Sequence, residues 1–350
     1  MQVVETSQCQ IHHVSAHVVG NKGNGEELFL SSDVLDISNE RLNESLKTYF
    51  LSHFQSPEFF TFTFPDEDFD LNPIYKCVGD IFAAPESFHE SSVSIASHLY
   101  AVSNHPNIKA GDLYVAYLSG LVVENTVTDA IGIFKSENKD RFLKLKKSSG
   151  SLSLSADEGT NVRKLDKGCL IFNMDTESGY RVSLVDNANH IDAQFWTRDF
   201  LNVTPWSDSF HHTKNFLGFT QQYLTDKMQD EFKVSKADQI DLLNRSVDFF
   251  KTRDQFDQRE FEMDVLGDAN VIESFRKFGS EYREQTDQDI VDNFEISAQA
   301  VKRQARIFKS VLKLDKNFHI YIHGSRELIE QGFDEVMGKK FYKIYFDSES

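Results

Sequence analysis

The sequence predicts an α+β fold: an N-terminal part with helices and a mostly antiparallel sheet, and a mainly helical C-terminal part that ends in a β-hairpin. Three observations predict it. Helical apolar spacing recurs between residues 38 and 104 and again after 211, short alternating apolar runs fill 112–185, and no helix-length segment separates those runs to make parallel crossovers. The chain has 350 residues, 40% of them hydrophobic, which exceeds one compact core, so we predict two domains, 1–205 and 206–350.

The first domain is expected to open with two strands and three helices. Residues 9–19 and 28–30 surround a glycine-rich turn at 21–25, which is typical of two short paired strands. Ser38 is a suitable N-cap for the first helix. The apolar spacing predicts helices over 38–50, 72–82 and 86–104, and His105-Pro106 ends the last of them.

An antiparallel sheet is expected from Asp112 to Val185. Its predicted strands are separated by clusters of Gly, Asn, Asp and Ser, and they are LYVAYL, LVVEN, AIGIFKS, FLKLK, CLIFN and YRVSLV. We interpret 148–155 as a small serine-rich turn. The earlier aromatic-rich stretch 59–64 is predicted to be a buried strand, and it would be a partner site if it were exposed.

The second domain is expected to follow a seam at 204–209. Ser235 and Asp238 have the spacing of a capping box, which predicts the start of a helix. Further helices are predicted over 211–228 and 259–284. Alternating apolar residues then predict two strands, 318–322 and 341–346, which pair across a short helical insert at 326–331.

No motif in the sequence indicates a catalytic, cofactor or metal site. Cys9, Cys77 and Cys169 are far apart and form no CxxC pair, so we expect reduced thiols. His212 and Lys214 have the HxK spacing of phospholipase-D-like nucleases, but no matching Asp follows. P-loop, GxGxxG, GxSxG and HExxH patterns are absent. We therefore expect a non-enzymatic protein with no cofactor and no metal, and a nuclease that uses scattered Asp, Glu and His remains a distant alternative.

The charge balance restricts the partners. The chain carries 37 basic and 55 acidic residues, a net charge of -18, of which residues 1–205 contribute -12. Such a chain is repelled by phosphate backbones unless its basic residues gather on one surface. No window holds the ~18 apolar residues that cross a bilayer, and the first residues lack the features of a secretory signal. We expect a cytoplasmic protein without a membrane partner.

One stretch near the C-terminus gathers basic residues. Residues 302–316 contain six basic residues and one acid, a net charge of +5. In a predicted helix over 297–313, Lys302, Arg306, Lys309 and Lys313 form one stripe beside an apolar face that can be buried. We predict that this helix contacts DNA phosphates through Lys302, Arg303, Arg306, Lys309, Lys313 and Lys316. The alternative is an ordinary solvated helix face, or one that pairs with acids elsewhere in this acidic chain.

Four blocks of sequence resemble a known family. They are DAIGIFKSENKD from Asp129, LDKGCLIFN from Leu165, VSKADQIDLLNR from Val234 and KSVLKLDKNFHIYIHG from Lys309. In order and spacing they are similar to the bacterial nucleoid-associated protein family, the NdpA/YejK-like group, in its Bacteroidetes-type branch. The resemblance implies an α+β protein of the cytoplasm that is recovered with the nucleoid and associated with DNA, and it implies no catalytic residues.

Two hypotheses for the function follow. The first is a non-enzymatic nucleoid-associated protein that binds DNA weakly and without sequence preference through the basic C-terminal helix. The second is an acidic adaptor that binds a DNA-processing protein and reaches the nucleoid through it. The acidic first domain and the aromatic stretch 59–64 motivate the second hypothesis. The sequence leaves open whether the chain forms a homo-oligomer.

Overall fold

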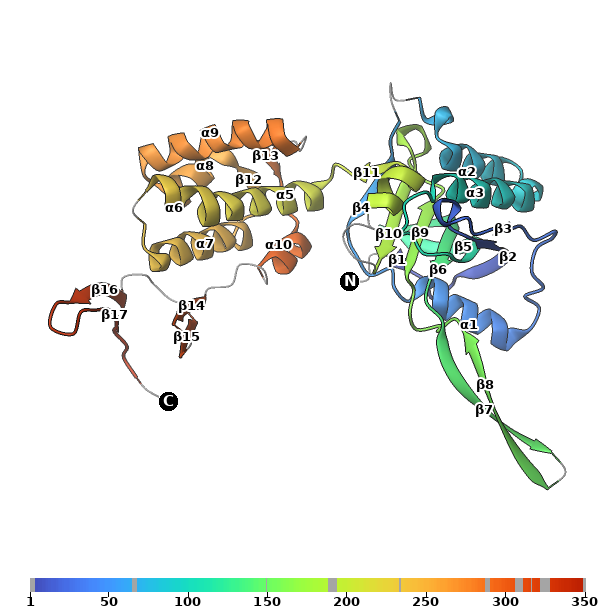
Figure 1. Ribbon diagram of the computed structural model, residues 1–350. Helices are drawn as coiled ribbons and strands as arrows, with labels where there is room; N and C mark the ends of the chain where they lie inside the picture. Colours follow the sequence, from blue (N-terminus) through green and yellow to red (C-terminus); the bar gives the residue numbers. More distant parts are fainter. Residues whose placement is uncertain are drawn as a thin grey trace. The chain divides into compact units, whose positions relative to one another are not determined.

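The computed structural model describes residues 4–64, 68–148, 150–187, 194–232, 234–286, 290–305, 311–315, 317–321 and 328–348. It divides into two compact units, Met1–Trp206 and Ser207–Ser350, and the boundary falls in the segment 204–209 (Figure 1). Each unit has its own hydrophobic core. The predicted α+β class is confirmed.

The first unit is built around an antiparallel nine-stranded sheet, as predicted. Its order is β11-β4-β10-β9-β6-β5-β2-β3, and β1 pairs with the end of β5. The strands are β1 (Val4–Glu5), β2 (Gln10–Val19), β3 (Leu28–Phe29), β4 (Phe59–Phe62), β5 (Gly111–Val123), β6 (Thr126–Ser136), β9 (Lys167–Phe172), β10 (Arg181–Asp186) and β11 (Val203–Pro205).

Strand β5 joins two runs that were predicted as separate strands. LYVAYL and LVV lie on one strand, whose register against β6 shifts between Leu118 and Leu121. Gly120 lies at this irregularity with φ +72°, and a Cβ there would approach Gln8 O to 2.7 Å. The Ser-Gly pair that resembled a strand boundary is therefore a bulge, where glycine accepts the left-handed backbone.

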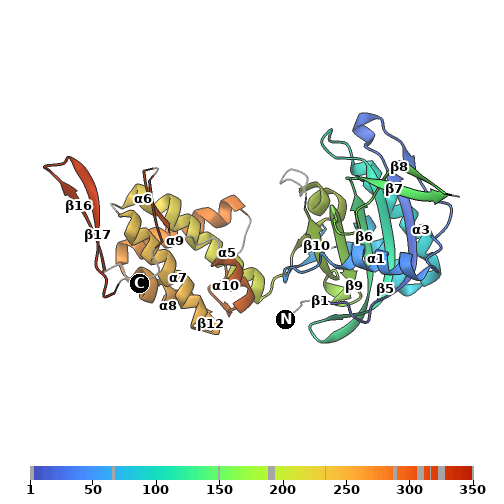
Figure 2. The same cartoon turned by 90° about the horizontal axis from the view of Figure 1, so that it is seen from below.

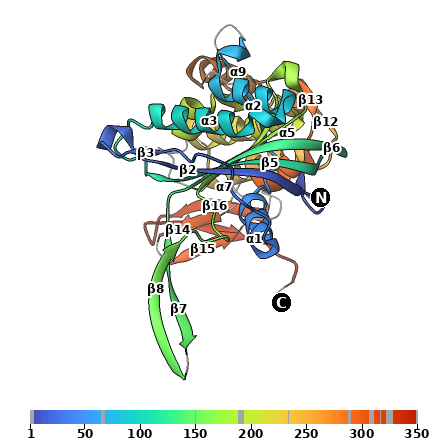
Figure 3. The same cartoon turned by 90° about the vertical axis from the view of Figure 1, so that its right-hand side faces the viewer.

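Helices cover both faces of this sheet (Figure 3). Phe50 of α1 stacks on Phe134 of β6 with ring centroids 4.2 Å apart, whereas α2 and α3 pack with Trp196 on the opposite face. The helices are α1 (Glu40–Leu51), α2 (Pro73–Ala83), α3 (Phe88–Val102) and the π-helical segment η6 (Phe195–Leu201). The first helix is capped by Asn39 and not by Ser38, because the Asn39 side chain accepts the Leu42 N–H at 3.0 Å.

The aromatic stretch forms an inner strand of the sheet. Strand β4 lies between β10 and β11, and Phe59 and Phe62 are buried. The predicted buried strand is confirmed, and the alternative of an aromatic partner site there loses its support.

A long two-stranded ribbon extends away from the sheet (Figure 1). It consists of β7 (Asp140–Ser148) and β8 (Ser151–Gly159), which pair with each other from Asp140–Gly159 to Ser148–Ser151. Two expectations are therefore wrong: FLKLK does not belong to the main sheet, and the serine-rich segment 148–155 is mostly a strand. The alternation of apolar and polar residues indicates a strand in either case, and it does not indicate the pairing partner.

The second unit is mainly helical, as predicted (Figure 2). Its core is rich in phenylalanine. The expected helix over 259–284 is interrupted at Gly267, whose φ of +71° lies outside the right-handed helical region. The elements are α5 (Ser209–Gln222), η7 (Tyr223–Lys227), α6 (Met228–Glu231), α7 (Lys236–Lys251), β12 (Gln255–Asp257), α8 (Gln258–Phe261), η8 (Glu262–Leu266), α9 (Ala269–Thr286), β13 (Asn293–Glu295) and α10 (Ala298–Gln304).

The C-terminal segment forms two hairpins where one was predicted. They are β14 (Val311–Leu314) with β15 (Phe318–Tyr321), and β16 (Ile329–Asp334) with β17 (Lys339–Ile344). A terminal strand pair is confirmed, but the pairing predicted for its strands is wrong, and residues 329–331 of the predicted helical insert lie on strand β16. Residues 326–327 of that insert lie outside the described residues. Each strand pairs with the neighbour across a short turn, which Asp315 (φ +52°) and Gly338 (φ +61°) permit.

Candidate nucleic-acid interface

The predicted basic residues begin on helix α10. The Ser297 side chain caps the helix, and the Ser297 N–H donates to Thr213 Oγ1 of α5 at 3.0 Å. Val301 is buried in the phenylalanine-rich core, whereas Lys302 and Arg303 are exposed in the last turn. Cations are favoured there, because the aligned peptide dipoles place partial negative charge at a helix C-terminus.

The expectation of one continuous helix over 297–313 is wrong. Helix α10 ends at Gln304, and Lys313 lies on strand β14 opposite His319 of β15. Leu312 is buried and its neighbour Lys313 is exposed, which is the two-residue period of a strand. Pairing with β15 satisfies the backbone hydrogen bonds of this segment, and it outweighs the helical spacing of the apolar residues. Lys313 therefore does not continue a helical stripe from Lys302.

The remaining predicted residues, Arg306, Lys309 and Lys316, lie outside the described residues. Lys302 and Lys313 are both exposed, and neither forms an ion pair with a residue that the structure describes. Their elements share a support, because α10 and β14 both contact α7. The described basic residues of this stretch, Lys302, Arg303 and Lys313, are thus carried by two separate elements of one unit.

The ribbon β7–β8 carries a second set of exposed basic residues, which the sequence prediction missed. Arg141, Lys144, Lys146 and Lys147 all lie on β7 and are exposed. Two of them have acidic neighbours on β8: Arg141 lies 2.6 Å from Glu158, and Lys144 lies 2.7 Å from Asp157. The matching alternation of FLKLK and SLSLS in adjacent segments is the signal that could have indicated a separate hairpin.

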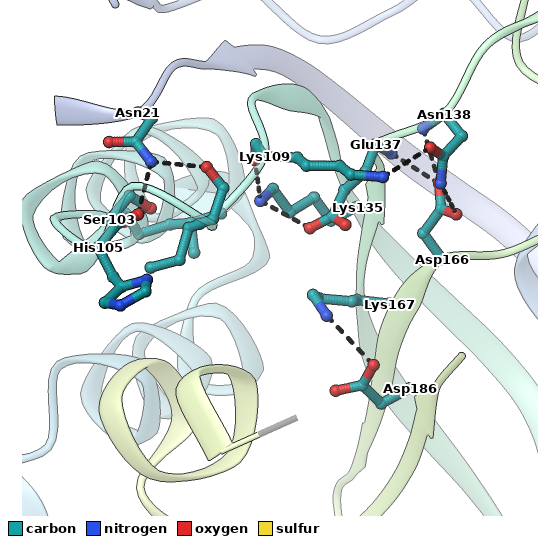
Figure 4. A network of polar contacts seen from close by, with 12 residues as sticks. Asn21, Ser103, His105, Lys109, Lys135, Glu137, Asn138, Asp166, Lys167 and Asp186 are labelled. Carbon is teal, nitrogen blue, oxygen red and sulfur yellow. Dashed lines mark hydrogen bonds and ion pairs between the residues drawn. The ribbon is translucent and has the colours of Figure 1, made fainter. Parts of the chain in front are cut away.

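Two further lysines are buried and hold the ends of three strands together (Figure 4). Lys135 of β6 and Lys167 of β9 are register partners. Lys135 Nζ lies 2.9 Å from Glu137 Oε1, and Lys167 Nζ lies 3.1 Å from Asp186 Oδ1. Because carboxylates inside the fold neutralise both charges, these lysines are not available to an external phosphate.

A cavity of about 570 Å³ lies in the second unit, and the basic and acidic side chains that line it are equal in number. Its charged lining residues are Arg259, Arg276, Arg283, Asp257, Glu262 and Asp292. Arg276 binds Glu262 at 2.5 Å and Arg283 lies 3.5 Å from Asp292. Within the described ranges, no group of three His, Cys, Asp or Glu residues has the geometry to hold a metal ion.

The family of the chain follows from a match over nearly its whole length. A family model described as nucleoid-associated protein YejK matches residues 15–341. The chain belongs to this family. The resemblance of the four sequence blocks is therefore confirmed, and the family's name links its members to the nucleoid. A search of curated proteins gives no match. Among the described helices of this YejK-family chain, none is long and apolar enough to cross a bilayer.

Proposed function

We propose that this protein binds DNA directly, weakly and without sequence preference, through the basic residues of its C-terminal segment. The observation that carries the proposal is the exposure of Lys302 and Lys313, with no acidic partner among the described residues, in a stretch of net charge +5. Lysine and arginine contacts to phosphates supply most sequence-independent affinity. The chain is otherwise acidic, so the contact surface is small and the binding is weak.

Both lysines stand on elements that the fold supports. Helix α10 is tied to α5 through Ser297 and to the core through Val301. Strand β14 buries Leu312 against Ile240 of α7. Basic residues on ordered elements lose less conformational entropy when they bind phosphates than residues on a free tail.

The proposal is tested by fluorescence anisotropy with a mixed-sequence duplex over a salt series. Wild type is expected to bind at low salt, with log K falling linearly as log salt rises. The variant Lys302→Glu/Arg303→Glu/Lys313→Glu is expected to bind more weakly, with a salt slope that is smaller by about three, since each phosphate contact contributes about one.

The matched control is Lys277→Glu/Lys339→Glu/Lys340→Glu, which makes the same charge change on α9 and β17 of the same unit. It is expected to bind much as wild type does. If both triple variants lose affinity equally, the contact is not localised at α10 and β14. If wild type does not bind even at low salt, the chain does not contact DNA directly.

The adaptor function is a second candidate, favoured by the turn between β16 and β17. Val336 is 98% exposed and Met337 is 67% exposed, and exposed apolar side chains of this kind mark partner contacts. Val336→Ser/Met337→Ser is then expected to reduce recovery of the protein with the nucleoid while its affinity for purified DNA stays unchanged. Unchanged recovery, together with wild-type binding to DNA, excludes this candidate.

A further inference from the structure

The ribbon β7–β8 exposes both of its faces. The two strands pair in register from Asp140–Gly159 to Ser148–Ser151, and no other described strand pairs with either of them. At ~3.3 Å per residue, nine paired residues make an arm about 30 Å long. An isolated two-stranded ribbon is marginally stable in water, so an arm of this length gains stability from a surface that it binds.

The charges of this arm are sorted along its length. Its three acids, Asp140, Asp157 and Glu158, all lie at the end next to the sheet. In sequence, the distal part, residues 144–155, contains three lysines, five serines and no acid. Lys146 and Lys147, nearest the tip, form no ion pair with a described residue. The tip is therefore positively charged in a chain of net charge -18.

The two faces of the arm differ in chemistry. Register and alternation place four leucines on one face, and their exposed fractions are 71% for Leu143, 65% for Leu145, 67% for Leu152 and 64% for Leu154. Lys147 lies on this face, opposite Leu152. Lys144 and Lys146 lie on the other face, opposite Ser155 and Ser153. The distal arm thus presents lysines on both faces and leucines on one of them.

We propose that this arm is a DNA-binding element that enters a groove of the duplex. Lys144, Lys146 and Lys147 contact the phosphates, and the directly opposed pair Leu145–Leu154 contacts sugars and base edges. A two-stranded ribbon fits the major groove of B-DNA, about 12 Å wide, and apolar side chains beside basic ones also serve as wedges in the minor groove. The arm spans about one turn of the double helix.

Charge complementarity favours DNA over a second copy of this chain as the occupant. A second copy of this acidic chain offers scattered carboxylates to the lysines, whereas duplex DNA carries one phosphate charge per ~1.7 Å of its axis. DNA uses both features, because its phosphates attract the lysines and its grooves accept apolar side chains. The inference rests on the proposed DNA binding, and it adds a contact on the first unit to the contact proposed on the second.

The test compares two arm variants with wild type in the same duplex and salt series. Lys146→Gln/Lys147→Gln is expected to lower affinity at low salt about tenfold or more and to reduce the salt slope by about two. Leu145→Ser/Leu154→Ser is expected to lower affinity a few-fold and leave the salt slope unchanged, since it removes no charge. All four side chains are exposed, so both variants should keep the unfolding midpoint of wild type.

Arg41→Gln/Lys76→Gln is the matched control, because it removes two exposed charges from α1 and α2 of the same unit. It is expected to bind as wild type does. The inference is overturned if wild type binds DNA but both arm variants bind equally well, and the proposed function then stands through the C-terminal residues. It is also overturned if the leucine variant changes the oligomeric mass in light scattering without changing DNA affinity, because the arm then contacts a second copy.

Absence of any binding by wild type is a different outcome. It rejects the proposed function itself, and with it every DNA contact, whereas the two outcomes above reject the arm alone. The DNA titrations and the light-scattering measurement together distinguish the three results.

Discussion

Lys135 shows how single residues hold the first unit together. It is fully buried, its Nζ lies 2.9 Å from Glu137 Oε1, and it also donates to the Lys109 carbonyl at 2.6 Å. A buried charge is costly unless a partner remains in place, because water no longer solvates it. The contribution of Glu137 is therefore larger than that of an acid in a surface pair.

Glu137→Gln is expected to lower the free energy of unfolding of the first unit by about 3 kcal/mol, since it removes the carboxylate charge that lies against the buried lysine. Urea titration followed by tryptophan fluorescence measures this, because both tryptophans, Trp196 and Trp206, belong to that unit. Glu158→Gln breaks the exposed pair with Arg141 and is expected to cost less than about 1 kcal/mol. Equal losses would contradict a special role for the buried pair.

His17 is held in its neutral form. The Ser31 N–H donates to its Nδ1 at 3.2 Å, and its Nε2 lies 3.1 Å from Ser92 Oγ. Since Nδ1 accepts, the proton of the neutral ring lies on Nε2, which donates to the hydroxyl. Burial, assisted by the nearby His89, lowers the pKa of His17 from 6.5 to about 4.

The lowered pKa of His17 predicts a loss of stability in acid. The unfolded chain binds the proton below pH 6.5 and the folded chain only near pH 4, so stability is complete above 6.5 and falls as the pH decreases through this window. The loss is about 3 kcal/mol at most. His17→Gln should show a smaller decrease in urea stability between pH 6.5 and 4.5. Parallel profiles for wild type and variant would mean that His17 titrates normally.

At the scale of elements, capping residues define where helices begin. Asn39, Asn72 and Ser235 each accept a backbone N–H of the first helical turn. The predicted capping box is confirmed in full: the Ser235 hydroxyl accepts the Asp238 N–H, and the Asp238 carboxylate accepts the Ser235 N–H at 3.1 Å. These contacts are local, so they follow from spacing along the chain.

Ser235→Ala is expected to destabilise the second unit by about 1 kcal/mol, because the first turn of α7 loses its side-chain acceptor. Far-UV circular dichroism during thermal unfolding measures the shift. Ser235→Thr retains the hydroxyl and should recover most of the loss. Failure of the threonine to recover stability would contradict a capping role for the serine hydroxyl.

At the scale of the whole molecule, the two units have separate hydrophobic cores. Leu170 and Ile171 belong to cores on opposite faces of the sheet in the first unit, and Phe216 and Phe275 belong to the core of the second. No residue belongs to cores of both units among the described residues. The elements of each unit bury their apolar side chains within that unit, so we predict that the two units unfold independently.

Phe275→Ala tests this independence, since Phe275 is fully buried and contacts Phe219 with ring centroids 4.8 Å apart. The substitution is expected to destabilise the second unit by about 3–5 kcal/mol. Circular dichroism should report the loss, while the tryptophan transition of the first unit stays in place. A tryptophan midpoint that moves by the same amount would show that the units unfold together.

The sequence by itself determined the class, the antiparallel sheet, the capping box and the family. Each of these depends on residues close together in the chain: alternation in 112–185, the Ser235–Asp238 spacing, or contiguous blocks such as Leu165–Asn173. Local spacing determines which side of a helix or strand is apolar, and this side is the same whichever element packs against it.

The tertiary structure alone decided which strands pair and which basic residues share an element. Lys313 lies on a strand and not on the predicted helix, because β14 forms backbone hydrogen bonds with β15. The lysines of β7 lie outside the main sheet, because β7 pairs with β8. Strand pairing joins backbones across the chain, and alternation is the same for a strand in a sheet, a short hairpin or a free arm. The residues of one strand therefore do not identify the strand that it pairs with. The pairing depends on all the segments that can form the same backbone hydrogen bonds.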